Sequence, residues 1–219
     1  MAVSSMTRSS LLVLTCVCFF TLFPPLILGD GANVVTDTNR TILLTTLAVA
    51  IANIILYPTT LAKNATSRPI RPLLTQVLDG LFIALISIPF LYFNFVCFGA
   101  PLLEKLDVTL SACVYVSCLA YMPIGILCGI DQEGIMKLLL HQAWRDDKEA
   151  LAYTAFIGTH FGMWVGAIAV PLDWDRPWQP WPISSCIACT CVYASSALGW
   201  GVLSMTKWSP VHTHKAKSG

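Results

Sequence analysis

The groups of this chain that could take part in chemistry or recognition concentrate in twelve residues, from Pro171 to Pro182. This stretch reads P-L-D-W-D-R-P-W-Q-P-W-P, so two carboxylates and one guanidinium lie among three indoles. Its four prolines prevent one continuous helix, and we expect a short, stiff loop between two apolar segments. Tryptophan at both ends suits a loop at a membrane surface, but the charged groups need a further explanation. The candidate contact residues are Asp173, Trp174, Asp175, Arg176, Trp178 and Trp181.

Two kinds of recognition suit this set of side chains. In the first, the loop docks a protein partner, because Trp and Arg are enriched at the energetic centres of interfaces and a proline-stiffened loop loses little entropy on binding. In the second, the loop holds a lipid headgroup: Asp173 or Asp175 and an indole face contact an ammonium group, while Arg176 contacts a phosphate. We favour docking, because headgroup binding requires a geometry that the sequence does not specify.

No catalytic spacing is evident elsewhere. The chain has no His-Glu-x-x-His, no glycine-rich phosphate loop and no nucleophile paired with a base. His141 and Asp146 have the spacing of an acyltransferase pair, but five positions along a helix separate their faces, so we attribute the match to chance. His160 lies in an apolar segment and could relay a proton or contact a headgroup; we favour a hydrogen bond to a neighbouring helix. We therefore predict no catalytic residue, no cofactor and no metal.

The composition indicates a membrane protein. Of the 219 residues, 56% are hydrophobic and 11% are charged, and the mean hydropathy is +0.69, which is too apolar for a soluble domain. No basic surface suited to nucleic acid is evident. Most of the nine cysteines fall within apolar segments, where we expect packing rather than disulfides, and Cys186-x-x-Cys189 has no second pair to complete a metal site.

Six apolar segments are long enough to cross a bilayer, so we predict one all-α membrane domain over residues 1–219. A span needs about 20 apolar residues at about 1.5 Å per residue. We favour a retained first span over a cleaved signal peptide, because Leu28-Gly29 is a poor cleavage site. The predicted spans are 11–28, 41–61, 78–98, 108–130, 152–172 and 183–205.

Several positions refine this picture. Pro123 and Gly125 predict a kink in the fourth span. Asp79, close to the start of the third span, is expected to extend to the membrane surface. Apolar residues recur at three- and four-residue steps between residues 131 and 151, which predicts a cytoplasmic amphipathic helix at the membrane surface. Small residues spaced by four predict a helix-packing face in the fifth span, made of Gly158, Gly162 and Gly166.

The distribution of positive charge predicts that both termini are cytoplasmic. With six spans, the side that holds the termini carries ten Lys and Arg residues and the other side carries three, and the richer side faces the cytoplasm. The loops around residues 99–104 and 171–182 then lie together on the lumenal side. The tail, 206–219, is expected to be flexible, and Lys215 and Lys217 stand where a dilysine retrieval signal of the endoplasmic reticulum would lie.

Two loops carry a specific resemblance to a known family. The segments G-A-P-L-L-E, Gly99 to Glu104, and G-A-I-A-V-P-L-D-W-D-R-P-W-Q-P-W-P-I-S, Gly166 to Ser184, resemble the phosphatidylinositol-glycan biosynthesis class F (PIG-F) family. Span number and loop placement agree over nearly the whole chain, while the sharp matches are confined to these loops. Asp175 stands where some members carry Glu. In the first loop we single out Gly99, Ala100, Pro101 and Glu104.

The resemblance implies a non-catalytic subunit in the assembly of glycosylphosphatidylinositol (GPI) anchors in the endoplasmic reticulum membrane. Such a subunit stabilises, as a heterodimer, a large ethanolamine-phosphate transferase that modifies mannoses of the GPI precursor with phosphatidylethanolamine as donor. Contact with either lipid stays open. The alternative is an independent lipid-modifying enzyme or small-lipid transporter, for which His160, and His141 with Asp146, give the best support.

Overall fold

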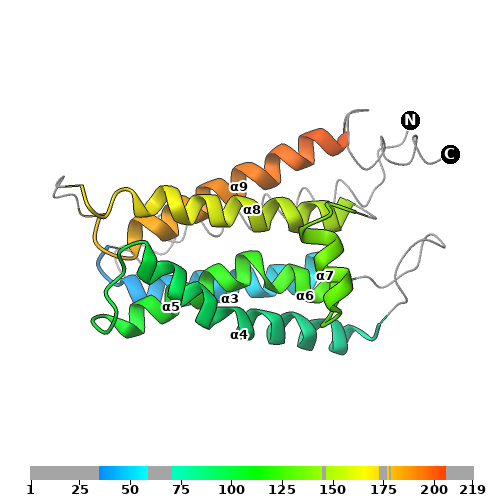
Figure 1. Ribbon diagram of the computed structural model, residues 1–219, viewed down its shortest axis with the longest axis horizontal. Helices are drawn as coiled ribbons and strands as arrows, with labels where there is room; N and C mark the ends of the chain where they lie inside the picture. Colours follow the sequence, from blue (N-terminus) through cyan, green and yellow to red (C-terminus); the bar gives the residue numbers. More distant parts are fainter. Residues whose placement is uncertain (1–34, 59–70, 145–146, 173–176, 178, 206–219) are drawn as a thin grey trace.

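The computed structural model describes residues 35–58, 71–144, 147–172, 177 and 179–205. These residues form helices joined by turns, with no strand among them, so the predicted all-α class is confirmed for this part of the chain. Figure 1 shows α8 and α9 along one side of the molecule and α3 to α6 along the other. The helices are α3 (Thr38–Leu56), α4 (Leu73–Cys97), α5 (Leu106–Ala120), α6 (Met122–Cys128), α7 (Gln132–Leu139), α8 (Asp147–Ala167) and α9 (Ile183–Met205).

Three helical segments in the described ranges are long and apolar enough to cross a membrane. They are α3, α4 and the run formed by α5 and α6, Leu106–Cys128, and they overlap three of the predicted spans. α8 and α9 overlap the predicted spans 152–172 and 183–205, but neither belongs to this group of three. The predicted span 11–28 and the tail 206–219 lie outside the described residues.

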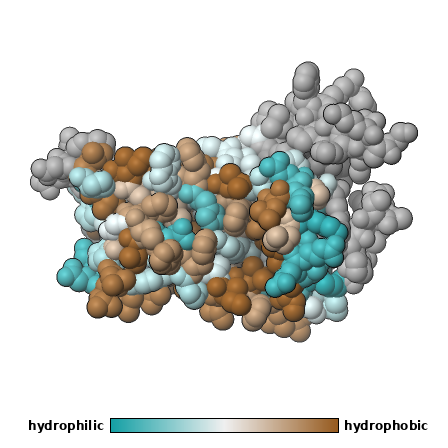
Figure 2. Space-filling model, in the orientation of Figure 1, coloured by the Kyte–Doolittle hydropathy of each residue, from teal (hydrophilic) through white to brown (hydrophobic). Residues whose placement is uncertain are grey.

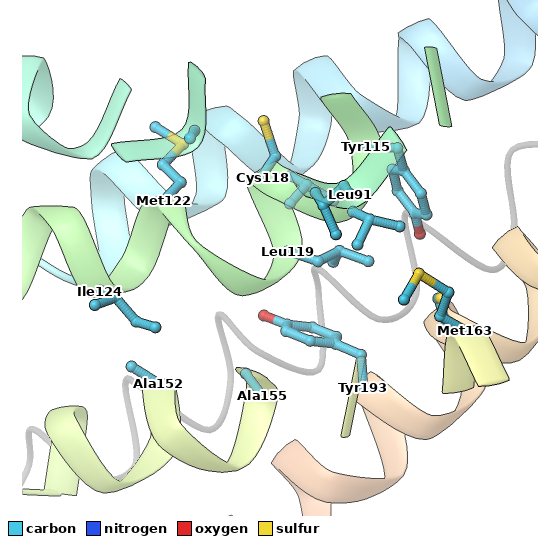
Figure 3. Close-up of a cluster of buried hydrophobic side chains, with 14 of the residues drawn as sticks. Leu91, Tyr115, Cys118, Leu119, Met122, Ile124, Ala152, Ala155, Met163 and Tyr193 are labelled. Atoms are coloured by element: carbon cyan, nitrogen blue, oxygen red, sulfur yellow. The ribbon is translucent and has the colours of Figure 1, made fainter. Parts of the chain in front are cut away.

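The α5–α6 run forms the centre of the bundle. Most of its residues are buried, whereas α3 and α4 expose large apolar side chains along one face. In Figure 3, Leu119 of α5 faces Tyr193 of α9, and Ile124 of α6 faces Ala152 of α8. Lipid tails are as apolar as Leu, so close packing, rather than exclusion of water, holds such helices together in a membrane.

Glycines bring α4 and α6 into backbone contact. A Cβ atom added to Gly125 would lie 2.7 Å from both the carbonyl oxygen of Asp79 and the Cα atom of Gly80, closer than real Cβ atoms approach. The run is interrupted at Tyr121, two residues before Pro123, which has no N–H for the helical ladder. The interruption that separates α5 from α6 therefore lies beside the residues for which a kink was predicted.

An ion pair ties the start of α4 to the end of α6. Arg71 pairs with Asp79, and the Nη2 atom of Arg71 donates to the carbonyl oxygen of Ile126, 2.7 Å away. A cation is favourable here because the last carbonyls of a helix lack helical donors and carry partial negative charge. Asp79 was expected to extend to the membrane surface. In the structure α4 begins at Leu73, and Asp79 lies in its second turn, where it pairs with Arg71.

The segment predicted as one amphipathic helix over residues 131–151 is divided in two. Asp131 caps α7 by accepting a hydrogen bond from the backbone N–H of Gly134, 3.1 Å away. The chain then leaves the helix, with Gln142 in the left-handed region at φ 50°, and α8 begins at Asp147. The three- and four-residue spacing of apolar residues continues through this segment, so the spacing alone does not predict the turn. Figure 2 shows hydrophilic side chains gathered over α7, at one end of the molecule.

Candidate functional site

The α4–α5 turn and the α8–α9 connection lie at the same end of the bundle (Figure 1). Trp181 links them. Its side chain is only 7% exposed, its indole N–H donates to Thr109 Oγ1 at 3.0 Å, and its ring meets that of Phe95 edge-on with centroids 4.9 Å apart. Because Phe95 lies in the last turn of α4 and Thr109 in the first turn of α5, Trp181 anchors the α8–α9 connection to the α4–α5 hairpin.

Further contacts set the path of the chain around Trp181. Gln179 donates from Nε2 to the carbonyl oxygen of Ala169, 3.2 Å away, so the connection folds back on the end of α8. The backbone N–H of Ile183 donates to the carbonyl oxygen of Pro180 at 2.9 Å, and α9 starts at Ile183. A cis peptide bond joins Trp181 to Pro182. The connection therefore enters α9 with its last Trp turned into the bundle.

The G-A-P sequence closes α4 in a Schellman arrangement. The N–H of Gly99 donates to the carbonyl oxygen of Val96 at 3.0 Å, and that of Ala100 donates to the carbonyl oxygen of Phe95 at 2.9 Å. Gly99 has φ 96°, a conformation that costs glycine little, and Pro101 follows because it cannot continue a helix. The buried methyl group of Ala100 joins the same cluster as Trp181. The two motifs thus share one hydrophobic anchor.

The α4–α5 turn exposes two leucines that the sequence analysis did not select. Leu103 is 81% exposed and Leu102 is also exposed, while the Tyr92 hydroxyl group donates to the carbonyl oxygen of Leu102. Both leucines belong to the G-A-P-L-L-E motif, but sequence alone assigns Leu to a core as readily as to a contact surface. We call this end the joined-loop surface; its described residues are Gly99, Pro101, Leu102, Leu103, Glu104, Pro177 and Gln179, with Ala100 and Trp181 buried beneath them.

The other candidate contact residues differ in their placement. Glu104 is exposed on the turn, Pro101 is half-buried, and Trp181 is directed into the bundle. The remaining residues selected for contact or retrieval lie outside the described part of the chain: Asp173, Trp174, Asp175, Arg176, Trp178, Lys215 and Lys217.

The glycine row of α8 positions this surface. A Cβ atom on Gly162 would lie 2.7 Å from the carbonyl oxygen of Ala188, and one on Gly166 would lie 2.5 Å from the Cα atom of Ser185. A Cβ atom on Gly158 would meet the side chain of Ser196. All three glycines therefore face α9. The backbones of α8 and α9 are in contact at Gly162 and Gly166, near the end of α8 and the start of α9.

The described residues offer contact surfaces rather than grouped reactive side chains. No three His, Cys, Asp or Glu residues gather there in a way that could hold a metal ion. Both ring nitrogens of His160 have partners: Nε2 is 3.0 Å from the Tyr121 hydroxyl group, and Nδ1 is 2.8 Å from the carbonyl oxygen of Phe156. His160 thus makes the hydrogen bond to another helix that we favoured. His141 is exposed, and Asp146 lies outside the described residues.

Apolar helices around a buried central run, joined at one end by two linked loops, are typical of a helical membrane protein. Comparison with known families is specific. The chain belongs to the GPI biosynthesis protein family Pig-F, whose family model matches residues 3–200.

Individual relatives agree with this assignment. The chain is 31% identical over 144 residues to the Glycosylphosphatidylinositol anchor biosynthesis protein 11 of Yarrowia lipolytica, a match that covers 64% of this chain and 63% of that protein. It is 27% identical over 178 residues to the mouse protein named GPI ethanolamine phosphate transferase, stabilizing subunit, with 81% of each chain covered. The human protein of that name is 31% identical over 105 residues, 46% of each chain. The chain thus spans less than two thirds of the Yarrowia and human proteins. No solved structure matches.

Proposed function

We propose that this chain is a non-catalytic stabilising subunit of a GPI ethanolamine phosphate transferase in the endoplasmic reticulum membrane. Membership of the Pig-F family and the names of the mouse and human relatives support this role. The structural observation that carries the proposal is the burial of Trp181 between Phe95 and Thr109. This contact joins the two loops that resemble the family into one surface.

The proposed subunit is a single membrane domain with six spans and both termini in the cytoplasm. Three described helical segments support three of these spans. α8 and α9 supply two more, and residues 11–28 supply the first. α7 lies at the cytoplasmic membrane surface, in agreement with its hydrophilic cover (Figure 2). The joined-loop surface then faces the lumen, and Lys215 and Lys217 retrieve the protein to the endoplasmic reticulum.

The joined-loop surface docks the catalytic partner, and the two chains form a heterodimer. Exposed Leu103 and Leu102 on a turn fixed by the G-A-P sequence are apolar groups already held in place, so little entropy is lost when a partner covers them. The side chains between Asp173 and Trp178 extend this contact. The active site belongs to the partner, and a lipid headgroup contact by Arg176 is the competing role for the loop.

Affinity purification tests the proposal. The full-length chain, tagged at the N-terminus, is recovered from microsomes in mild detergent, and we expect a GPI ethanolamine phosphate transferase to accompany it. Replacing Leu102 and Leu103 together by Ser is expected to reduce that recovery. Leu140→Ser is the matched control, because Leu140 is also exposed but lies at the opposite end, beside α7. Absence of the transferase from the wild-type sample would overturn the proposal.

Arg176→Ala separates the two roles of the loop. Lower recovery of the transferase supports docking, whereas an intact complex with weakened use of the phospholipid donor supports headgroup binding. An independent enzyme or transporter gains no support from the described residues, since His160 is engaged by Tyr121 and Phe156 within the chain.

A further inference from the structure

One tyrosine ties the exposed leucine turn to the body of α4. The Tyr92 hydroxyl group donates to the carbonyl oxygen of Leu102, ten positions further along the chain. The Tyr92 ring is half-buried and packs against the hydrophobic core, so the donor is held by a packed side chain. Tyr also has only two side-chain torsions to fix. The hydrogen bond therefore holds Leu102 in one position relative to α4.

The turn depends on this bond because its backbone has little other support. The hydrogen bonds that close α4 end with the N–H of Ala100, and α5 begins at Leu106. Among the described residues, Tyr92 is the one side chain that bonds to the backbone of residues 101–104. Lys105, which follows, has φ 54°, in a region that non-glycine residues seldom adopt. Without the Tyr92 hydroxyl group, the path of the turn is free to vary.

The leucines that the turn displays lie among charged groups. Leu102 and Leu103 are 59% and 81% exposed, and the next two residues, Glu104 and Lys105, are exposed as well. Charged side chains are unfavourable in hydrocarbon, which indicates that this turn lies outside the hydrocarbon core. Neighbouring large apolar side chains that are exposed outside a membrane are typical of a protein contact.

We propose that Tyr92 is a positioning residue for docking: it holds Leu102 and Leu103 in the orientation that the catalytic partner binds. The inference rests on the proposed function and gives α4 a part in recognition at the joined-loop surface. Apolar groups that are ordered before binding lose less entropy when a partner covers them. Tyr92 provides this order through the turn and makes no contact of its own with the partner.

Tyr92→Phe tests the proposal, since it removes the hydroxyl group and keeps the ring. We expect recovery of the GPI ethanolamine phosphate transferase with the tagged full-length chain to fall about fivefold, the effect of one hydrogen bond. The thermal midpoint of the free chain should change little, because water replaces the bond at an exposed turn. An unchanged recovery, or a midpoint that falls together with the recovery, would overturn the proposal.

Tyr153→Phe is the matched control. Tyr153 is also half-buried, and its hydroxyl group accepts one hydrogen bond, from Gln142 Nε2 at 3.0 Å. Gln142 follows α7, so this bond lies away from the joined-loop surface. The control should leave recovery of the transferase unchanged, and an equal fall from both variants would contradict a specific role of Tyr92.

A double-variant cycle shows whether Tyr92 acts through the leucines. In a chain that carries both Leu102→Ser and Leu103→Ser, the addition of Tyr92→Phe should lower recovery no further, because the groups that Tyr92 positions are already absent. A fivefold fall in this background too would show that Tyr92 acts independently, and the positioning role would be wrong.

Cleavage by trypsin after Lys105 reports the order of the turn in the free chain. We expect Tyr92→Phe to accelerate this cleavage about fivefold, because the open form of the turn is more populated, and Tyr153→Phe to leave it unchanged. This measurement needs no transferase. If the wild-type chain recovers the transferase but Tyr92→Phe changes neither cleavage nor recovery, only this inference falls. If the wild-type chain recovers no transferase, the proposed function falls and the inference falls with it.

Discussion

At the residue scale, Trp181 acts through both parts of its side chain. The ring packs against Phe95, and the indole N–H reaches Thr109 Oγ1, so the buried polar atom keeps a partner. The hydrogen bond and the ring contact together fix a single orientation of the Trp181 side chain. An apolar ring without the hydrogen bond could pack in several orientations. This side chain therefore fixes the start of α9 relative to the α4–α5 turn.

Trp181→Phe is expected to lower the stability of the purified chain by about 1 kcal/mol, because it removes one hydrogen bond and keeps most of the ring contact. Thr109→Val should cost a similar amount, and the double variant should cost little more than either one. Thermal unfolding in detergent measures this. Trp164→Phe, on the exposed face of α8, is the control and should change the midpoint little. Fully additive losses at residues 181 and 109 would show that the two side chains act independently.

Arg71 is a second residue whose role depends on two partners. It neutralises Asp79 and donates to the carbonyl oxygen of Ile126 at the end of α6. Arg71→Gln should therefore cost about 2 kcal/mol, the scale of a hydrogen bond to a charged group. Exchanging the pair, with Arg71→Asp and Asp79→Arg together, should not restore stability, because a carboxylate at position 71 cannot donate to that carbonyl. Recovery of the wild-type thermal midpoint by the exchange would contradict this.

At the element scale, α8 and α9 pack closely because glycines, which have no side chain, line the face of α8 that contacts α9. Gly162 and Gly166 let the two helix backbones approach more closely than any Cβ atom would permit. Such an interface depends on shape, because lipid is as apolar as the helices themselves. The hairpin also carries the loop that Trp181 anchors, so its spacing affects the joined-loop surface.

Gly162→Ala should separate α8 from α9, since the new Cβ atom would lie 2.7 Å from the carbonyl oxygen of Ala188. We expect a loss of about 1–3 kcal/mol, as for other overpacked cores. Gly199→Ala is the matched control on α9, where nothing lies within 4 Å of an added Cβ atom. It should be neutral or stabilising, because alanine favours a helix. Similar losses from both variants, by thermal unfolding, would argue against the backbone contact.

At the scale of the whole molecule, the two ends of the bundle differ. One end holds the joined-loop surface, and the other holds α7 with its hydrophilic cover (Figures 1 and 2). Exposed leucines mark both ends, Leu103 on the α4–α5 turn and Leu140 after α7. This asymmetry makes the proposed orientation accessible to a labelling experiment.

In intact microsomes, Leu140→Cys is expected to react with a membrane-impermeant maleimide, while Leu103→Cys is expected to react only after detergent opens the lumen. Positive charge is enriched on the side of residue 140, and this enrichment is the basis of the proposed cytoplasmic placement. Both positions are highly exposed, so intrinsic access does not explain a difference. Labelling is measured by gel shift against the unsubstituted chain. The reverse pattern would invert the proposed topology.

The helical class and the family follow from the sequence by itself, because they depend on local quantities. Long apolar runs separated by charged or proline-rich segments require helices in a membrane, and the two loop motifs carry the Pig-F resemblance. The glycine row at residues 158, 162 and 166 is a periodic pattern that any helix displays on one face. Each of these features can be predicted from the sequence without knowing which segments are in contact in the folded protein.

Only the tertiary structure decided which segments meet. Trp181 reads as a surface residue in the sequence, and its burial depends on Phe95 and Thr109, more than 70 positions away. Arg71 reads as a loop charge, yet it caps α6 and holds Asp79 inside α4. In each case the deciding partner is distant along the chain, and neither hydropathy nor spacing encodes such a contact.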